Sequence, residues 1–161
     1  MKKLVLLLGA VTLTAGNLFA AVDQKQLDGA VMEYQRSMVE NFCVGFRIHK
    51  IAVTPALKEQ IARLSGAFIR DTVLPALKKH RLEETWVKCV SDPELRALQL
   101  QTQKINDEKE LRRTIEAIIK LMNEKYPILV NTVFADPEYQ AGFKKLVDDL
   151  RVQINIPAKT K

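Results

Sequence analysis

Hydrophobic residues recur at every third or fourth position over most of the chain beyond residue 21. This spacing places them on one face of an α-helix, as expected for helices that bury one face. No stretch clearly shows the period of two that is typical of β-strands, and the apolar segment from Ile128 to Phe134 is the nearest exception. The pattern predicts an all-α fold, a single-domain bundle of about six helices over residues 21–154. The repeating positions are Leu27, Val31, Tyr34, Met38, Phe42 and Phe46; Leu57, Ile61, Leu64 and Phe68; Leu111, Ile115, Ile118, Ile119, Met122 and Tyr126; and Tyr139, Phe143, Leu146, Val147, Leu150 and Ile154.

Three prolines mark expected helix starts, because each follows a residue that can cap a helix. The side-chain oxygen of Thr or Asp accepts a free backbone N–H of the first turn, and proline at the next position loses no hydrogen bond there. The three pairs are Thr54-Pro55, Asp92-Pro93 and Asp136-Pro137. We therefore expect a helix to begin at each pair.

Other residues predict where helices end or bend. Pro75 is expected to end or kink the second helix, whose apolar face reaches Val73 only after a short phase shift. The apolar phase also changes near Asn106, where Asp107 is suited to cap a new helix. Residues 155–161 lack periodicity and are expected to form a flexible basic tail.

The first 20 residues have the pattern of a cleavable signal peptide. Lys2 and Lys3 form a basic start, Leu4–Gly16 form an apolar stretch, and Ala20 supplies the small residue beside the cleavage point. A membrane-spanning helix needs about 20 apolar residues, whereas this stretch is shorter and interrupted by glycine and threonine. The sequence predicts export to the periplasm, with secretion outside the cell as the alternative.

The composition is that of a globular protein. Of the 161 residues, 47% are hydrophobic and 27% charged, which excludes a disordered chain, and the length fits one domain rather than a multidomain enzyme. The formal charge of +6 at pH 7 includes Lys2 and Lys3, so the exported chain is only mildly basic. Such a charge favours anionic partners weakly.

The two cysteines, Cys43 and Cys89, predict one disulfide. In an exported protein a pair of cysteines is typically structural. Closing a loop of about 47 residues would stabilise the fold by about 4 kcal/mol. The alternative, a redox-active pair, normally has a Cys-x-x-Cys spacing, which these residues lack.

Basic residues gather at two places that together form a candidate basic patch. The clusters are Arg47, His49 and Lys50, and Lys78, Lys79, His80 and Arg81, with Arg112 and Arg113 as a further pair. An acidic protein, an acidic polymer or lipid headgroups would fit such a patch, and the alternative is a set of separate solvated faces. Nucleic acid is not expected, because aromatic residues do not interleave the clusters. No histidine spacing suggests a metal site.

A second candidate patch is apolar. Its residues are Ile128, Leu129, Val130, Val133 and Phe134. Two interpretations fit this segment: a buried helix at the centre of the bundle, or an exposed patch that receives a partner helix or an acyl chain.

These observations predict a binding protein with a protein partner, without a cofactor. The first alternative is a carrier of a lipid or other apolar ligand between helices, and the second is a small exported hydrolase or redox enzyme. An apolar cavity of at least about 300 Å³ would favour the carrier, whereas perturbed titratable groups together in a cleft would favour an enzyme.

Overall fold

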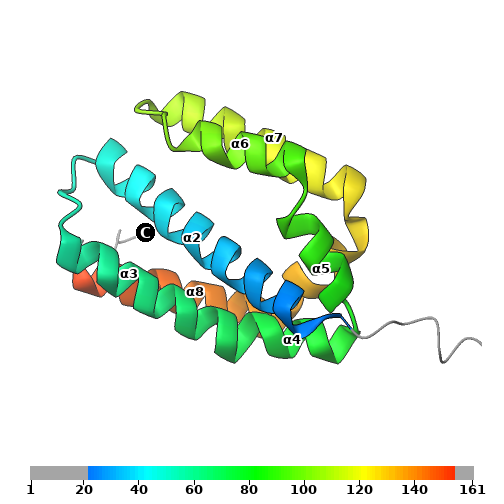
Figure 1. Ribbon diagram of the computed structural model, residues 1–161. Helices are drawn as coiled ribbons and strands as arrows, with labels where there is room; N and C mark the ends of the chain where they lie inside the picture. Colours follow the sequence, from blue (N-terminus) through cyan, green and yellow to red (C-terminus); the bar gives the residue numbers. More distant parts are fainter. Residues whose placement is uncertain (1–21, 155–161) are drawn as a thin grey trace, which may run out of the picture.

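A computed structural model describes residues 22–154, and over that range the chain is helical without a strand (Figure 1). The predicted all-α fold is confirmed, with seven α-helices and two π-helical segments in the described range. The elements are α2 (Gln24–Ile48), α3 (Pro55–Phe68), η1 (Ile69–Val73), α4 (Leu74–His80), α5 (Glu83–Val90), α6 (Pro93–Thr102), α7 (Glu108–Lys125), η2 (Leu129–Phe134) and α8 (Pro137–Gln153). The predicted signal peptide, residues 1–20, and the predicted tail, residues 155–161, lie outside the described residues.

The predicted helix starts match the observed ones. The Thr54 hydroxyl accepts the backbone N–H of Leu57 at 3.1 Å, and α3 begins at the following proline. Asp92 and Asp136 cap α6 and α8 in the same way, each followed by proline. Asp107 caps α7, so the change of apolar phase near Asn106 marks a break between two helices.

The helix that contains Pro75 does not end there. Instead, α3, η1 and α4 form a continuous helical rod in which the backbone N–H of Leu74 bonds to the carbonyl of Ile69, five residues back. Proline clashes with the carbonyl four residues before it in a regular α-helix, and a widened π turn avoids this clash. The rod ends at Arg81, which adopts a left-handed conformation with φ 55°.

The core lies where α2, the rod and α8 pack together. In Figure 1, α2 runs antiparallel to the rod, and α8 lies behind both. The side chains of Ile61, Val73, Leu77, Leu129 and Val133 are fully buried there. Helices α6 and α7 form a hairpin on the far side of α2, and α5 connects this hairpin to the rod.

Asp92 fastens the base of the α6–α7 hairpin. Its carboxylate accepts hydrogen bonds from the Lys125 ammonium group at 3.2 Å and from the Tyr126 hydroxyl at 2.9 Å. Burial by itself raises the pKa of Asp92. The hydrogen bonds from the Leu95 N–H, Tyr126 and Lys125 together lower this pKa by more than burial raises it, so it lies below its usual value. Burial and the bond to Asp92 raise the pKa of Tyr126 to about 12. The end of α7 is therefore fixed to the start of α6.

The predicted disulfide is wrong, because Cys43 and Cys89 are both free thiols in the structure. Helices α2 and α5, which carry the two cysteines, pack together. However, the part of α2 that shares a pocket with Cys89 is the part that contains Tyr34. Cys43 lies about 13 Å further along the α2 axis than Tyr34. A disulfide joins residues whose Cα atoms are about 4.4–6.8 Å apart, so the two cysteines stand at different levels of α2.

Candidate functional site

An apolar pocket of about 380 Å³ lies between the α6–α7 hairpin and the rest of the bundle. Side chains from α2, α5, α6, α7, η2 and α8 form its walls. We call it the apolar pocket, and it is lined by Tyr34, Trp86, Cys89, Val90, Leu95, Gln99, Met122, Phe134, Tyr139, Gln140 and Phe143. Small-molecule sites are typically hollows of about 300–1,000 Å³ lined mainly by apolar and aromatic groups, and this pocket fits that description.

Aromatic contacts hold the walls of the apolar pocket in place. The Tyr34 and Trp86 rings meet edge to face with centroids 5.5 Å apart, and the Tyr139 ring packs against Phe134 at 5.2 Å and Phe68 at 5.4 Å. The Tyr34 and Tyr139 hydroxyls lie 3.2 Å apart and share a hydrogen bond. These contacts join α2, α5 and α8, so the pocket is formed before any ligand arrives.

The titratable side chains in the pocket are neutral near pH 7. Burial raises the pKa of Tyr34 and of Tyr139, and it raises the pKa of Cys89 to about 12. No acidic or basic side chain is among the described residues that line the pocket. The environment therefore suits an uncharged molecule.

Neither cysteine has the surroundings of a reactive thiol. Burial is the main reason that the pKa of Cys43, like that of Cys89, is raised. A redox or nucleophilic cysteine needs a thiolate, and a raised pKa makes this form scarce. The geometry does not support the redox alternative.

One buried polar group in the pocket wall lacks a partner. The Trp86 side chain is 1% exposed, and its indole nitrogen has no hydrogen-bond acceptor among the described residues. A buried donor without an acceptor costs about 1–3 kcal/mol. Most such donors in native proteins are satisfied, and this one is closed off from solvent as well as from an acceptor.

An exposed apolar stripe continues from the pocket along α7. Met122 belongs to the pocket wall, and Ile119 and Ile115 precede it on the same helical face. These two isoleucines are 52% and 44% exposed. On α8, Phe143 is 40% exposed at the pocket edge. The opening of the pocket therefore has apolar side chains on both α7 and α8.

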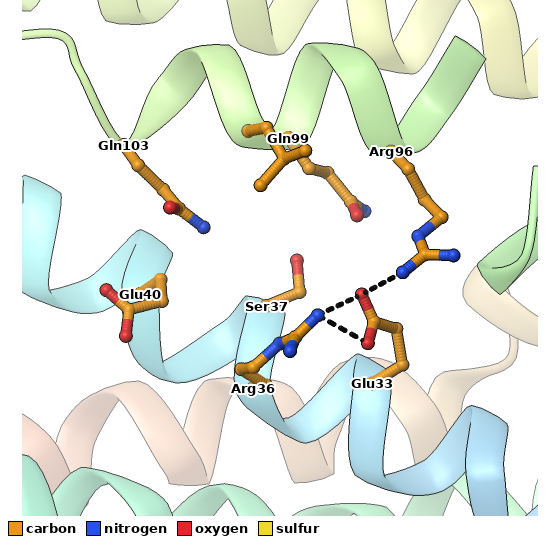
Figure 2. Close-up of a pocket in the computed structure, with 8 residues that line it drawn as sticks. Glu33, Arg36, Ser37, Glu40, Arg96, Gln99 and Gln103 are labelled. Atoms are coloured by element: carbon orange, nitrogen blue, oxygen red, sulfur yellow. Dashed lines mark hydrogen bonds and ion pairs between the residues drawn. The ribbon is translucent and has the colours of Figure 1, made fainter. Parts of the chain in front are cut away.

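Two other hollows are lined by many charged groups. Figure 2 shows the one between α2 and α6, with a volume of about 260 Å³. There Glu33 binds Arg36 at 2.6 Å and Arg96 at 3.2 Å, so these charges are already paired. The second hollow, of about 480 Å³ between α2 and α5, includes Lys88 and Glu84, which pair at 2.7 Å. Both hollows have charged side chains in their lining, whereas the described residues that line the apolar pocket include none.

The structure does not assemble the candidate basic patch. Arg47, His49 and Lys50 lie at the end of α2, whereas the cluster 78–81 ends the rod beside the start of α2 (Figure 1). With 25 residues, α2 separates them by about 37 Å. Lys79 and His80 are also engaged by the Asp136 carboxylate, at 3.0 and 3.2 Å. The exposed pair Arg112 and Arg113 stands on α7.

The candidate apolar patch is divided between core and surface. Leu129 and Val133 are fully buried, whereas Ile128 is 53% exposed. Val130 is half-buried, and Phe134 contributes to the wall of the apolar pocket. Neither of the two interpretations holds for the whole segment, because η2 buries only one face.

Of the residues that line the pocket, the sequence analysis named only Cys89 and Phe134 as candidate site residues, and it assigned both to other features. Tyr34, Met122 and Tyr139 were assigned to buried helical faces as core residues, and Trp86 is not on a repeating stripe. A signal was present in the two tyrosines, because each places a hydroxyl that needs a partner among aliphatic positions. Their pairing depends on how α2 and α8 pack, which periodicity does not specify.

Among residues 22–154, no three side chains of the types that bind metals come together, and no helix has both the length and the apolarity needed to cross a bilayer. Comparison of the chain with protein-family models, curated proteins and solved structures found no match.

Proposed function

We propose that this protein binds a small apolar molecule in the apolar pocket. The observation that carries this proposal is a hollow of about 380 Å³ lined by aromatic and aliphatic side chains and a few neutral polar groups. Its volume and lining are those of ligand sites in helical proteins. The paired tyrosines and their aromatic neighbours support a site that is formed in advance.

Export forms part of this proposal. The pattern of residues 1–20 supports passage into the periplasm, or out of the cell, before the domain acts. In that setting the protein would hold or carry a poorly soluble molecule between helices.

A neutral fluorescent dye tests the proposal directly. Titration of the folded protein with N-phenyl-1-naphthylamine is expected to give saturable binding with about one site per chain, because the dye fits an apolar hollow of this size. Gln140→Trp places a large ring at the pocket edge and is expected to weaken binding at least about fivefold. Dye fluorescence measures both affinities.

Gln101→Trp is the matched control for this titration. Gln101 is exposed on α6 and does not line the pocket, so this variant should bind the dye like the unaltered chain. If both variants bind equally well, or if the folded protein binds no dye, ligand binding in the apolar pocket is excluded.

A second candidate function is protein binding through the α6–α7 hairpin. Its support is the exposure of Leu100, Ile115 and Ile119, which are 56%, 44% and 52% exposed. Exposed apolar side chains on one face of a helix are typical of surfaces that bind a partner helix. Under this function, dye binding would be weak, would not saturate at one site, and would not respond to Gln140→Trp.

A further inference from the structure

We infer that the ligand of this protein is a nonionic amphiphile, with an aliphatic chain in the apolar pocket and a hydroxylated head group in the neighbouring hollow between α2 and α6. We call this second space, of about 260 Å³, the polar hollow. The inference rests on the proposed function and names the chemical class of its ligand. It depends on the position of Gln99, which lines both spaces, and on the neutral polar side chains of the polar hollow.

Gln99 brings the apolar pocket and the polar hollow within the extent of one residue. It lies on α6, is half-buried and lines both spaces. Its side-chain amide forms no hydrogen bond with another described residue, so no such bond holds the side chain in one rotamer. A change of rotamer at Gln99 would therefore let one molecule extend from the polar hollow into the apolar pocket.

The charged side chains of the polar hollow are already paired. Glu33 binds Arg36 at 2.6 Å and Arg96 at 3.2 Å. Glu40 binds Lys58 at 2.8 Å. The hollow is lined by two carboxylates and two guanidinium groups, whose formal charges cancel. An ionic head group would gain a partner only by breaking one of these pairs, so the polar hollow favours an uncharged head group.

Three neutral side chains of the polar hollow have unused hydrogen-bonding groups. The Ser37 hydroxyl on α2 and the side-chain amides of Gln99 and Gln103, on and just after α6, point into the gap from opposite helices (Figure 2). None of them forms a hydrogen bond with another described residue. A serine hydroxyl and a glutamine amide can each donate and accept. Hydroxyl groups of a ligand, which also do both, are therefore the matching partners.

Three compounds with an eight-carbon chain test this inference on the full folded chain. They are 1-O-octylglycerol, 1-octanol and octanoate, each used below the concentration at which it forms micelles. Displacement of bound N-phenyl-1-naphthylamine is expected to show octylglycerol binding about threefold to tenfold more tightly than octanol, because its head group adds hydrogen bonds in the polar hollow. Octanoate should bind most weakly, because its charge has no unpaired partner there.

Ser37→Ala combined with Gln103→Met removes two of the neutral groups without altering the apolar pocket, which neither residue lines. This double variant should bind octylglycerol no more tightly than octanol, and its affinity for octanol should stay within about twofold of that of the unaltered chain. Gln101→Met is the matched control, since Gln101 is exposed on α6 and lines neither space. It should keep the preference for octylglycerol.

A second measurement needs no variant. In NMR spectra of the folded chain, octylglycerol should shift both the Gln103 side-chain amide and the methyl group of Met122, which lines the apolar pocket, whereas octanol should shift only the Met122 methyl group. Equal affinities for octylglycerol and octanol, an unmoved Gln103 resonance, or tightest binding of octanoate would overturn the amphiphile inference and leave the proposed function intact. Failure of all three compounds to displace bound dye would also overturn it alone, whereas absence of dye binding would overturn both.

Discussion

At the scale of single residues, Asp136 combines two structural roles. Its carboxylate accepts the backbone N–H of Glu138 at the start of α8, and it binds the Lys79 ammonium group and the His80 ring from the end of α4. The hydrogen bonds from His80 and Lys79 hold the pKa of Asp136 well below its usual range. One nearly buried carboxylate thus caps one helix and binds the end of another.

Asp136→Asn tests the charge of this carboxylate, since asparagine keeps an oxygen for the cap. We expect the melting temperature to fall by a few degrees at pH 7. A depressed folded-state pKa stabilises the fold above the unfolded-state pKa of about 3.9, and this contribution is lost as the pH falls toward the folded-state value. The difference between the two proteins should therefore shrink below about pH 4 in thermal unfolding followed by circular dichroism.

The control is Asp23→Asn at the cap of α2. Asp23 accepts the backbone N–H of Lys25 at 3.1 Å and forms no ion pair among the described residues, so the variant should change the melting temperature little. Equal losses from the two substitutions would mean that capping, not the bound cations, explains the effect of Asp136.

At the scale of elements, α8 lies close against the rod at Gly142. A methyl group at this position would lie 2.5 Å from Oγ1 and 2.7 Å from Cγ2 of Thr72 in η1. The threonine side chain is β-branched and has few alternative rotamers, so it has little freedom to move away. The lack of a side chain at Gly142 therefore sets the spacing between α8 and the rod.

Gly142→Ala is expected to destabilise the protein by about 1–3 kcal/mol, because the added methyl group overpacks this contact. Gly45→Ala in α2 is the matched control, since an added methyl group there meets no atom within 4 Å. It should stabilise the protein by about 0.5–1 kcal/mol through helix propensity alone. Urea denaturation measures both, and a stabilising Gly142→Ala would show that α8 moves freely relative to η1.

Helix boundaries could be predicted because the chemistry that sets them is local. Thr54, Asp92, Asp107 and Asp136 each accept a backbone N–H within the first turn of the helix they cap, and no distant residue is needed for that bond. The π turn before Pro75 could not be predicted from capping residues. The shift in the apolar phase before Val73 was the one sign of it in the sequence.

The contacts between helices could not be predicted in this way. The disulfide was inferred from the predicted compartment and the number of cysteines. A disulfide also requires that Cys89 of α5 lie opposite Cys43 on α2, and in the structure the two thiols are free. The basic patch failed for a similar reason, since its two clusters end helices that point in opposite directions. The pocket collects side chains from six elements, and no single stripe reveals it.

At the scale of the whole molecule, the described domain begins just beyond the predicted cleavage point. Asp23 caps α2, whose first residue is Gln24, so cleavage after Ala20 would leave the cap and the whole helix intact. We expect a chain produced from residue 21 to melt at the same temperature as the full chain. When the full chain is expressed in a bacterium, the protein recovered from the periplasm should begin at Ala21 by mass spectrometry, and recovery of only the uncleaved chain from the cytoplasm would refute export.

The π turn in the rod makes the number of residues in that segment critical. Each residue turns a helix by about 100°, so a deletion or insertion between Phe68 and Pro75 would rotate Leu77, now fully buried, toward solvent. Natural variants of this protein should therefore accept exchanges of side chains along the rod but rarely a change in its length. The connection between Ile48 and Pro55 is the place where extra residues would be tolerated.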